Sequence, residues 1–103
     1  MIPDLPKSIR RLIDYGINTV APDRVILFGS RARGDAREDS DYDLAFDFSS
    51  ERRLFWLRFV TAAADVPITL RPTDLVAWHE ASPALQDHIK HEGIIIYDRS
   101  KDL

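Results

Sequence analysis

The 103 residues suffice for one small domain, and 45% hydrophobic with 30% charged residues is ordinary for a globular protein. The net charge of −3 gives no general basic surface for nucleic acid, and the lack of cysteine excludes disulfides and thiol chemistry. No apolar run approaches the roughly 20 residues of a membrane span, and no signal peptide is visible. We therefore expect residues 1–103 to form a single cytoplasmic domain.

The first half of the chain predicts one helix and two strands. Residues 6–20 carry apolar side chains at helical spacing, and Arg24–Phe28 is a short apolar run typical of a strand buried on both faces. Residues 29–40 form a polar connector that has room for a short helix over 31–36, and residues 42–48 have the pattern of a second strand. The length of the connector is compatible with parallel or antiparallel pairing of the two strands.

A second long helix is predicted to begin at Ser49-Ser50-Glu51 and to run to about Ala64. Its apolar residues form one stripe of Leu54, Leu57, Val60 and Ala64, a second stripe of Phe55, Phe59 and Ala62, and a third side with Trp56. A small domain easily buries one such stripe. The extra apolar surface indicates either deep burial or a surface for a partner, and the sequence leaves both open.

The last third of the chain predicts two strands and two helices. Val66–Arg71 has the composition of a third strand, and a helix is expected to resume at Pro72–Trp78. Ser82-Pro83 is a typical helix start, Gly93 is expected to end that helix, and Ile94–Tyr97 forms a final strand. The fold class is therefore α/β (α+β), with helices packed on a small sheet.

Two aspartates and a Gly-Ser pair carry the chemistry of this chain. Side chains two apart on a strand share a face, so Asp41 and Asp43 can aim two oxygen ligands at one point, which suits Mg²⁺ together with phosphate oxygens. Gly29 allows a ligand close to the backbone, and Ser30 offers a hydroxyl and an N–H to a phosphate. The connector adds three forked phosphate donors, Arg31, Arg33 and Arg37. The pattern predicts a metal-bridged polyphosphate site.

Each of these residues also has a plain structural interpretation. Asp41 and Asp43 could be turn residues before a strand, but the Gly-Ser pair ahead of them favours metal ligands. Arg33 is either a nucleotide contact or a solvated loop residue, and exposed arginines are common enough that Arg31 and Arg37 favour the second interpretation.

Gly29-Ser30, ten further residues and Asp41-Tyr42-Asp43 form the pattern GSx₁₀DxD, which resembles the signature of minimal nucleotidyltransferases in the DNA polymerase β-like superfamily. The resemblance spans most of the chain and implies the polymerase β-like nucleotidyltransferase fold, a small mixed β-sheet with helices packed on it. It implies that Asp41 and Asp43 are catalytic and hold Mg²⁺. It also implies a set of residues that bind ATP or another NTP: Gly29, Ser30, Arg33 and Ser40.

In that superfamily a third acidic residue on a neighbouring strand helps to deprotonate the attacking hydroxyl. The strand expected over Val66–Arg71 places Thr69 at this position, and threonine cannot act as a base near neutral pH. Asp65 and Asp74 flank that strand and would reach the site only in an altered register. This alignment predicts that nucleotide and one metal bind while the chemistry is slow or absent.

The resemblance implies transfer of a nucleoside monophosphate, AMP from ATP, to a protein hydroxyl. It also implies an antitoxin whose partner is a HEPN-domain ribonuclease toxin. The alternative is a catalytically weak or inactive binding module that neutralises its partner by contact through helix 51–64. On this alternative, Phe59→Asp would disrupt the complex and leave the domain folded. A nucleic-acid-modifying enzyme is a third possibility, against which the acidic net charge argues.

Overall fold

The computed structural model describes residues 4–65 and 68–101. In chain order its elements are α1 (Lys7–Val20), β1 (Arg24–Phe28), α2 (Ser30–Arg33), β2 (Tyr42–Asp47), the 3₁₀ helix η1 (Ser50–Arg52), α3 (Arg53–Asp65), β3 (Thr73–Ala77), the 3₁₀ helix η2 (Trp78–Glu80), α4 (Pro83–Glu92) and β4 (Ile94–Asp98). Within the described ranges, no helix has the length and apolar character needed to cross a bilayer.

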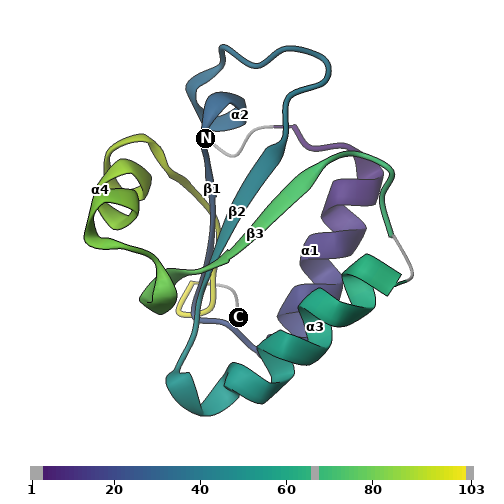
Figure 1. The fold of residues 1–103 in the computed structure, drawn as a ribbon, viewed down its shortest axis with the longest axis vertical. Coiled ribbons are helices and arrows are strands. Elements are labelled where there is room, and N and C mark those ends of the chain that lie inside the picture. Colours follow the sequence, from purple (N-terminus) through teal and green to yellow (C-terminus); the bar gives the residue numbers. More distant parts are fainter. Residues whose placement is uncertain (1–3, 66–67, 102–103) are drawn as a thin grey trace.

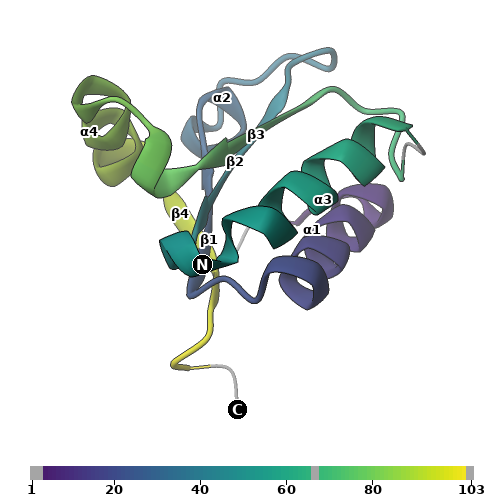
Figure 2. The ribbon, with the colours of Figure 1, turned by 60° about the horizontal axis from the view of Figure 1, so that its bottom comes forward.

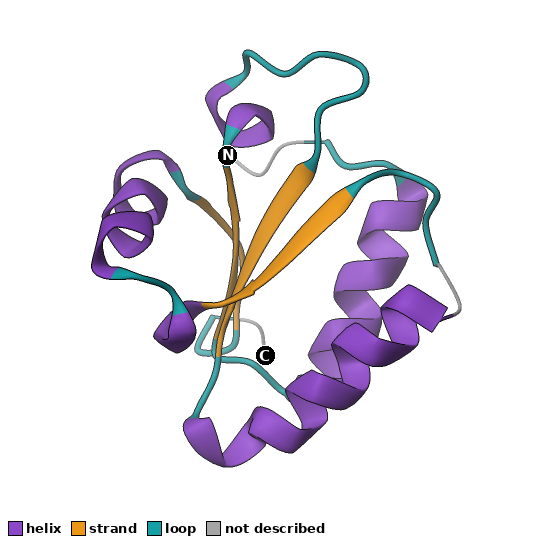
Figure 3. Ribbon diagram, viewed as in Figure 1, coloured by secondary structure: helices purple, strands orange, loops and turns teal. Residues whose placement is uncertain are grey.

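The strands form one mixed sheet in the order β3-β2-β1-β4 (Figures 1 and 3). β1 pairs antiparallel with both β2 and β4, which settles the connector after β1 as an antiparallel connection. β2 pairs in parallel with β3, and this pairing requires the long crossover that α3 supplies. The mixed sheet with packed helices confirms the predicted fold class.

The two long helices α1 and α3 lie side by side on one face of the sheet (Figures 1 and 2). They bury the main core against the residues of β2 that point to that side, Tyr42, Leu44 and Phe46. The ring of Phe46 lies 5.4 Å from Trp56 and 5.3 Å from Phe59, measured between centroids. This face of the sheet is therefore filled by packed aromatic side chains.

The shorter helix α4 covers the opposite face. There Ile89 packs with Ile26, Phe28 and Ala45 in a second, smaller apolar cluster. Because side chains alternate along a strand, Asp43 lies on the same face as Ala45 and thus on the side of α4. Alternate residues of β2 therefore belong to the two apolar clusters. Asp43, near the start of β2, lies on the face that α4 covers.

Most of the elements that local patterns predicted are present. The helix over 6–20 is α1, and the strands over 24–28 and 42–48 are β1 and β2. The short connector helix occupies Ser30–Arg33, earlier than expected, because Gly34 ends it at a φ of 87°. The last helix is α4, whose Ser82 hydroxyl accepts the Leu85 N–H at 3.2 Å, and β4 follows it.

The helix after Ser49 resolves the question of its apolar stripes. Trp56 and Phe59 are buried, and Phe59 has no exposed surface. The interpretation of Phe59 as part of a partner surface is therefore wrong, because this ring fills the core between α3 and the sheet. The large apolar residues of α3 that stay exposed are Leu54, Phe55 and Leu57, with relative exposures of 58%, 36% and 41%.

The third strand was predicted in the wrong place. Val66 and Pro67 lie outside the described residues, Ile68–Arg71 is not a strand, and Leu70 is 97% exposed. The strand is instead β3, within the segment for which a helix was expected. Pro72 immediately precedes it, and its carbonyl accepts the Tyr42 N–H at 2.9 Å. Pairing with β2 thus overrides the local helical pattern, as tertiary context commonly does.

Candidate active site

The predicted site residues meet at one edge of the sheet. There β1 ends, β2 and β3 begin, and the chain passes from α4 into β4. The antiparallel register sets Phe28 opposite Asp43, so Gly29 follows directly beside the start of β2. The parallel register sets Asp74 beside Asp43. Residues distant in sequence are therefore brought together by strand pairing.

Three carboxylates gather at this edge. Asp41 and Asp43 are two residues apart, and Asp74 is the register partner of Asp43 on β3, so its side chain points to the same face. Asp43 is half-buried, and Asp41 and Asp74 are exposed. Burial, followed by the charges of Asp74, Asp41 and Glu92, raises the pKa of Asp43 to about 6 from its ordinary 3.8, while Arg33 opposes the shift. The edge therefore concentrates negative charge.

The alignment of Thr69 with the third acidic position is wrong, because Thr69 lies outside the sheet. Its hydroxyl lies 2.8 Å from that of Ser8 on α1 and accepts the Arg71 N–H at 3.1 Å. The strand that borders β2 is β3, in which Asp74 is the register partner of Asp43. The sequence analysis named Asp74 only as a flanking residue that would need an altered register, because it placed the strand too early in the chain, although Pro72 was a usable signal for a strand start.

The carboxylates fit a divalent cation. Within residues 4–65 and 68–101, no group of three or more acidic, histidine or cysteine side chains is placed to hold a metal ion. An open set of carboxylates is nevertheless what Mg²⁺ uses, since it takes one or two of them together with phosphate oxygens and water. Burial and then the neighbouring carboxylates raise the pKa of Asp43, and a bound cation would offset both effects by neutralising negative charge.

Gly29 permits the close approach of the backbone to Asp43. Its φ is 74°, a left-handed value that favours glycine, and a Cβ at this position would collide with the Asp43 carboxylate. Any larger residue would therefore push the carboxylate away from the edge. The predicted need for glycine here has a direct structural basis.

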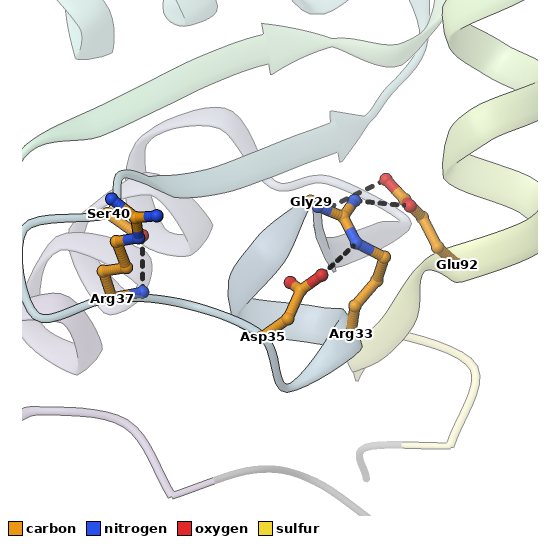
Figure 4. A network of polar contacts seen from close by, with 6 residues as sticks. All are labelled: Gly29, Arg33, Asp35, Arg37, Ser40 and Glu92. Atoms are coloured by element: carbon orange, nitrogen blue, oxygen red, sulfur yellow. Dashed lines mark hydrogen bonds and ion pairs between the residues drawn. The ribbon is translucent and has the colours of Figure 1, made fainter.

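Arg33 and Glu92 form a polar network with Gly29 (Figure 4). The Arg33 Nη1 donates to Glu92 Oε2 at 2.8 Å, and the Gly29 N–H donates to Glu92 Oε1 at 3.1 Å. Arg33 also contacts Asp35 at 3.3 Å. The hydrogen bond from Arg33 lowers the pKa of Glu92, and the same bond raises the pKa of Arg33. Glu92 was not predicted, because its contact depends on α4 ending beside β1.

The remaining connector residues fix the backbone of the segment that leads to Asp41. Ser40 accepts the Arg37 N–H on its hydroxyl at 2.8 Å, which closes a turn. Arg31 donates to the carbonyls of Ser40 and Glu38, each at 3.0 Å, and its guanidinium lies 4.4 Å from the centre of the Tyr42 ring. Arg31 thus ties α2 to the start of β2.

Ser30 is the first residue of α2, next to Gly29. Its carbonyl accepts the Gly34 N–H at 3.0 Å, and the residue is partly exposed at the edge that carries the carboxylates. The structure therefore brings Gly29, Ser30 and Arg33 to the same edge as Asp41 and Asp43. Ser40 lies within the turn that leads to them.

Comparison with known proteins identifies the family. The model of the polymerase β nucleotidyltransferase family matches residues 10–102, and the chain belongs to this family. No curated protein sequence matches the chain significantly.

Solved structures share the fold. A protein described as a minimal nucleotidyltransferase is 32% identical, with a TM-score of 0.61 over 85% of this chain and 92% of the other. A toxin–antitoxin structure with AMP-PNP is 24% identical, with a TM-score of 0.58 over 92% of this chain and 74% of the other. A nucleotidyltransferase from Sulfolobus solfataricus is 21% identical, with a TM-score of 0.56 over 98% and 96%.

Proposed function

We propose that this chain is a Mg²⁺-dependent nucleotidyltransferase that uses ATP and transfers AMP to a hydroxyl group of a partner protein. The observation that carries the proposal is the register that sets Asp74 beside Asp43, with Asp41 two residues away. In this proposal Asp74, and not Thr69, is the third acidic residue of the site. The membership of the chain in the nucleotidyltransferase family supports the same reaction class.

The residues divide the work by position. Asp41 and Asp43 would hold Mg²⁺, which supplies charge neutralisation of the phosphates and polarises the phosphoryl group. The exposed Asp74 carboxylate accepts the proton of the attacking hydroxyl. The hydroxyl oxygen forms a bond to the α-phosphorus, the bond from that phosphorus to the bridging oxygen breaks, and pyrophosphate leaves. Gly29, Ser30 and Arg33 bind the phosphates, and Ser40 supports the nucleotide from the connector.

The partner that we propose is a HEPN-domain toxin, which this chain would silence as an antitoxin. The fold shared with a toxin–antitoxin structure that contains AMP-PNP supports a toxin as the partner and the use of an adenine nucleotide. The choice of a HEPN domain follows from the resemblance of the GSx₁₀DxD motif.

The experiment is nucleotide transfer with α-labelled ATP and Mg²⁺, with and without the co-purified partner. The proposal predicts that label moves to the partner and that the double variant Asp41→Asn/Asp43→Asn abolishes the transfer. Label that moves equally well in the double variant would contradict the assignment of the site.

A second candidate is a binding module that neutralises its partner by contact alone. The exposed Leu54, Phe55 and Leu57 on α3 favour it, because neighbouring exposed apolar residues indicate interaction surfaces. This candidate predicts a tight complex and neutralisation that survive Asp41→Asn/Asp43→Asn. Loss of neutralisation in that variant, with the complex intact, would instead support the transferase.

A further inference from the structure

The carboxylate of Glu92 occupies two donors at the edge of the sheet. One of its oxygens accepts the Gly29 N–H at 3.1 Å, and the other accepts a guanidinium N–H of Arg33 at 2.8 Å. Figure 4 shows both contacts reaching the same carboxylate. Two oxygens of one anion thus bridge a backbone N–H and an arginine, the donors that a phosphate group also uses. These are two of the donors that the proposed function assigns to the nucleotide.

Glu92 stands where a negative charge is otherwise unfavourable. It is the last residue of α4, and the C-terminal end of a helix carries partial negative charge. Its charge is also among those that act on Asp43. Yet its side chain is only 19% exposed, whereas that of Arg33 is 46% exposed. The carboxylate is therefore held in place by the two donors and not by its position on the helix.

Gly93 fixes the place of this carboxylate. A Cβ on Gly93 would collide with the Ile89 carbonyl and with the Ile26 side chain on β1. The end of α4 is consequently packed tightly against β1, next to Gly29. Gly29 directly follows β1. The donor, its N–H, and the acceptor, the Glu92 carboxylate, are therefore carried by two elements that pack on each other. The contact is built into the fold and does not depend on a flexible surface arginine alone.

We propose that Glu92 is an internal competitor of the nucleotide: its carboxylate holds the Gly29 N–H and Arg33 in the free protein, and a nucleotide phosphate displaces it. This inference rests on the proposed function and adds a regulatory contact to the same site. Nucleotide binding then releases the end of α4 from the start of α2. A partner that draws Glu92 away would in turn tighten nucleotide binding, since coupling between two sites is reciprocal.

The test measures Mg²⁺–ATP affinity of the full chain by calorimetry for wild type and Glu92→Gln. The substitution keeps the shape of the side chain and removes its charge, so we expect affinity to rise about 3- to 10-fold, the size of a modest charged contact. Glu80→Gln is the matched control. It removes the same charge and likewise breaks an arginine pair, that of Glu80 with Arg53 at 3.1 Å. Because neither residue belongs to the proposed nucleotide site, the affinity of this variant for Mg²⁺–ATP should stay at the wild-type value.

A double-mutant cycle tests the route of the effect. Arg33→Gln removes the donor for which Glu92 and the phosphate compete, so the gain from Glu92→Gln should shrink in the Arg33→Gln background. Glu92→Asp keeps the charge but retracts the carboxylate, and it should also raise affinity. If Glu92→Gln fails to fold, as judged by its melting transition, the affinity of Glu92→Asp tests the competition instead.

The opposite results overturn the inference. Unchanged binding in folded Glu92→Gln would show that Glu92 does not compete with the nucleotide, and weaker binding would show that Glu92 instead positions Arg33 for it. In either case wild-type binding remains and the proposed function stands. A failure of wild type and all variants to bind Mg²⁺–ATP would overturn the proposed function together with the inference.

Discussion

Asp43 ionises in unfavourable surroundings at the edge of the sheet. It is half-buried, it pairs in register with Asp74, and Gly29 brings the backbone against it. These surroundings disfavour its charged form and raise its pKa to about 6. A carboxylate in this state gains from a bound cation, and the free protein is destabilised by keeping it ionised.

The first prediction concerns stability and pH in the absence of metal. The folded-state pKa of Asp43 lies above its ordinary 3.8, so its contribution to stability is fully present below that value and is lost as pH rises toward 6. Asp43→Asn cannot ionise. At pH 7.5 it should be more stable than wild type by on the order of 1 kcal/mol, a figure reduced for partial solvent exposure.

Denaturant unfolding at pH 4 and pH 7.5 measures this difference, which should nearly vanish at pH 4. Adding Mg²⁺ and ATP at pH 7.5 should raise the melting temperature of wild type and leave Asp43→Asn unchanged. An Asp43→Asn protein that is less stable than wild type at both pH values would refute the account of this residue.

Among the elements, the position of β3 and the buried side of α3 were the features that the sequence did not predict. The patterns of α1, β1, β2, α4 and β4 are local, and the sequence predicted all of these elements. β3 has only five residues and forms because β2 offers it a parallel partner, a contact that no local pattern contains. In α3 the spacing showed several apolar sides, but only packing on Phe46 selects Trp56 and Phe59 as core.

The second prediction separates the two sides of α3. Phe59 is fully buried, so Phe59→Ala should lower the free energy of unfolding by about 3–5 kcal/mol, measured by urea denaturation. Leu57 is 41% exposed, and Leu57→Asp should change that free energy by less than about 0.5 kcal/mol.

The Leu57→Asp variant also tests the partner surface. Leu57→Asp should weaken the co-purified complex, and replacement of exposed Thr61 by Asp, one turn along the helix, is the matched control for added charge. A complex that withstands Leu57→Asp would remove this side of α3 from the interface.

On the scale of the whole molecule, the two faces of the sheet serve different purposes. α1 and α3 fill one face with the main core, while α4 packs on the opposite face (Figure 2). Asp43, with Gly29 against it, lies on the side of α4. The motif predicted the residues of the site, and the structure brings them together. Their binding and catalytic roles stay predictions. Glu92 was not predicted and Asp74 was set aside, because helix packing and strand pairing alone bring these two residues to the motif.

The most direct test of the account compares Asp74→Asn with Thr69→Ala in AMP transfer from labelled ATP to the co-purified partner. If Asp74 is the base, Asp74→Asn should slow single-turnover transfer at least about 100-fold while Mg²⁺–ATP still binds. Thr69→Ala should transfer at the wild-type rate, because Thr69 contacts Ser8 away from the edge. Transfer that survives Asp74→Asn, or that depends on Thr69, would contradict the central claim that β3 supplies the third carboxylate.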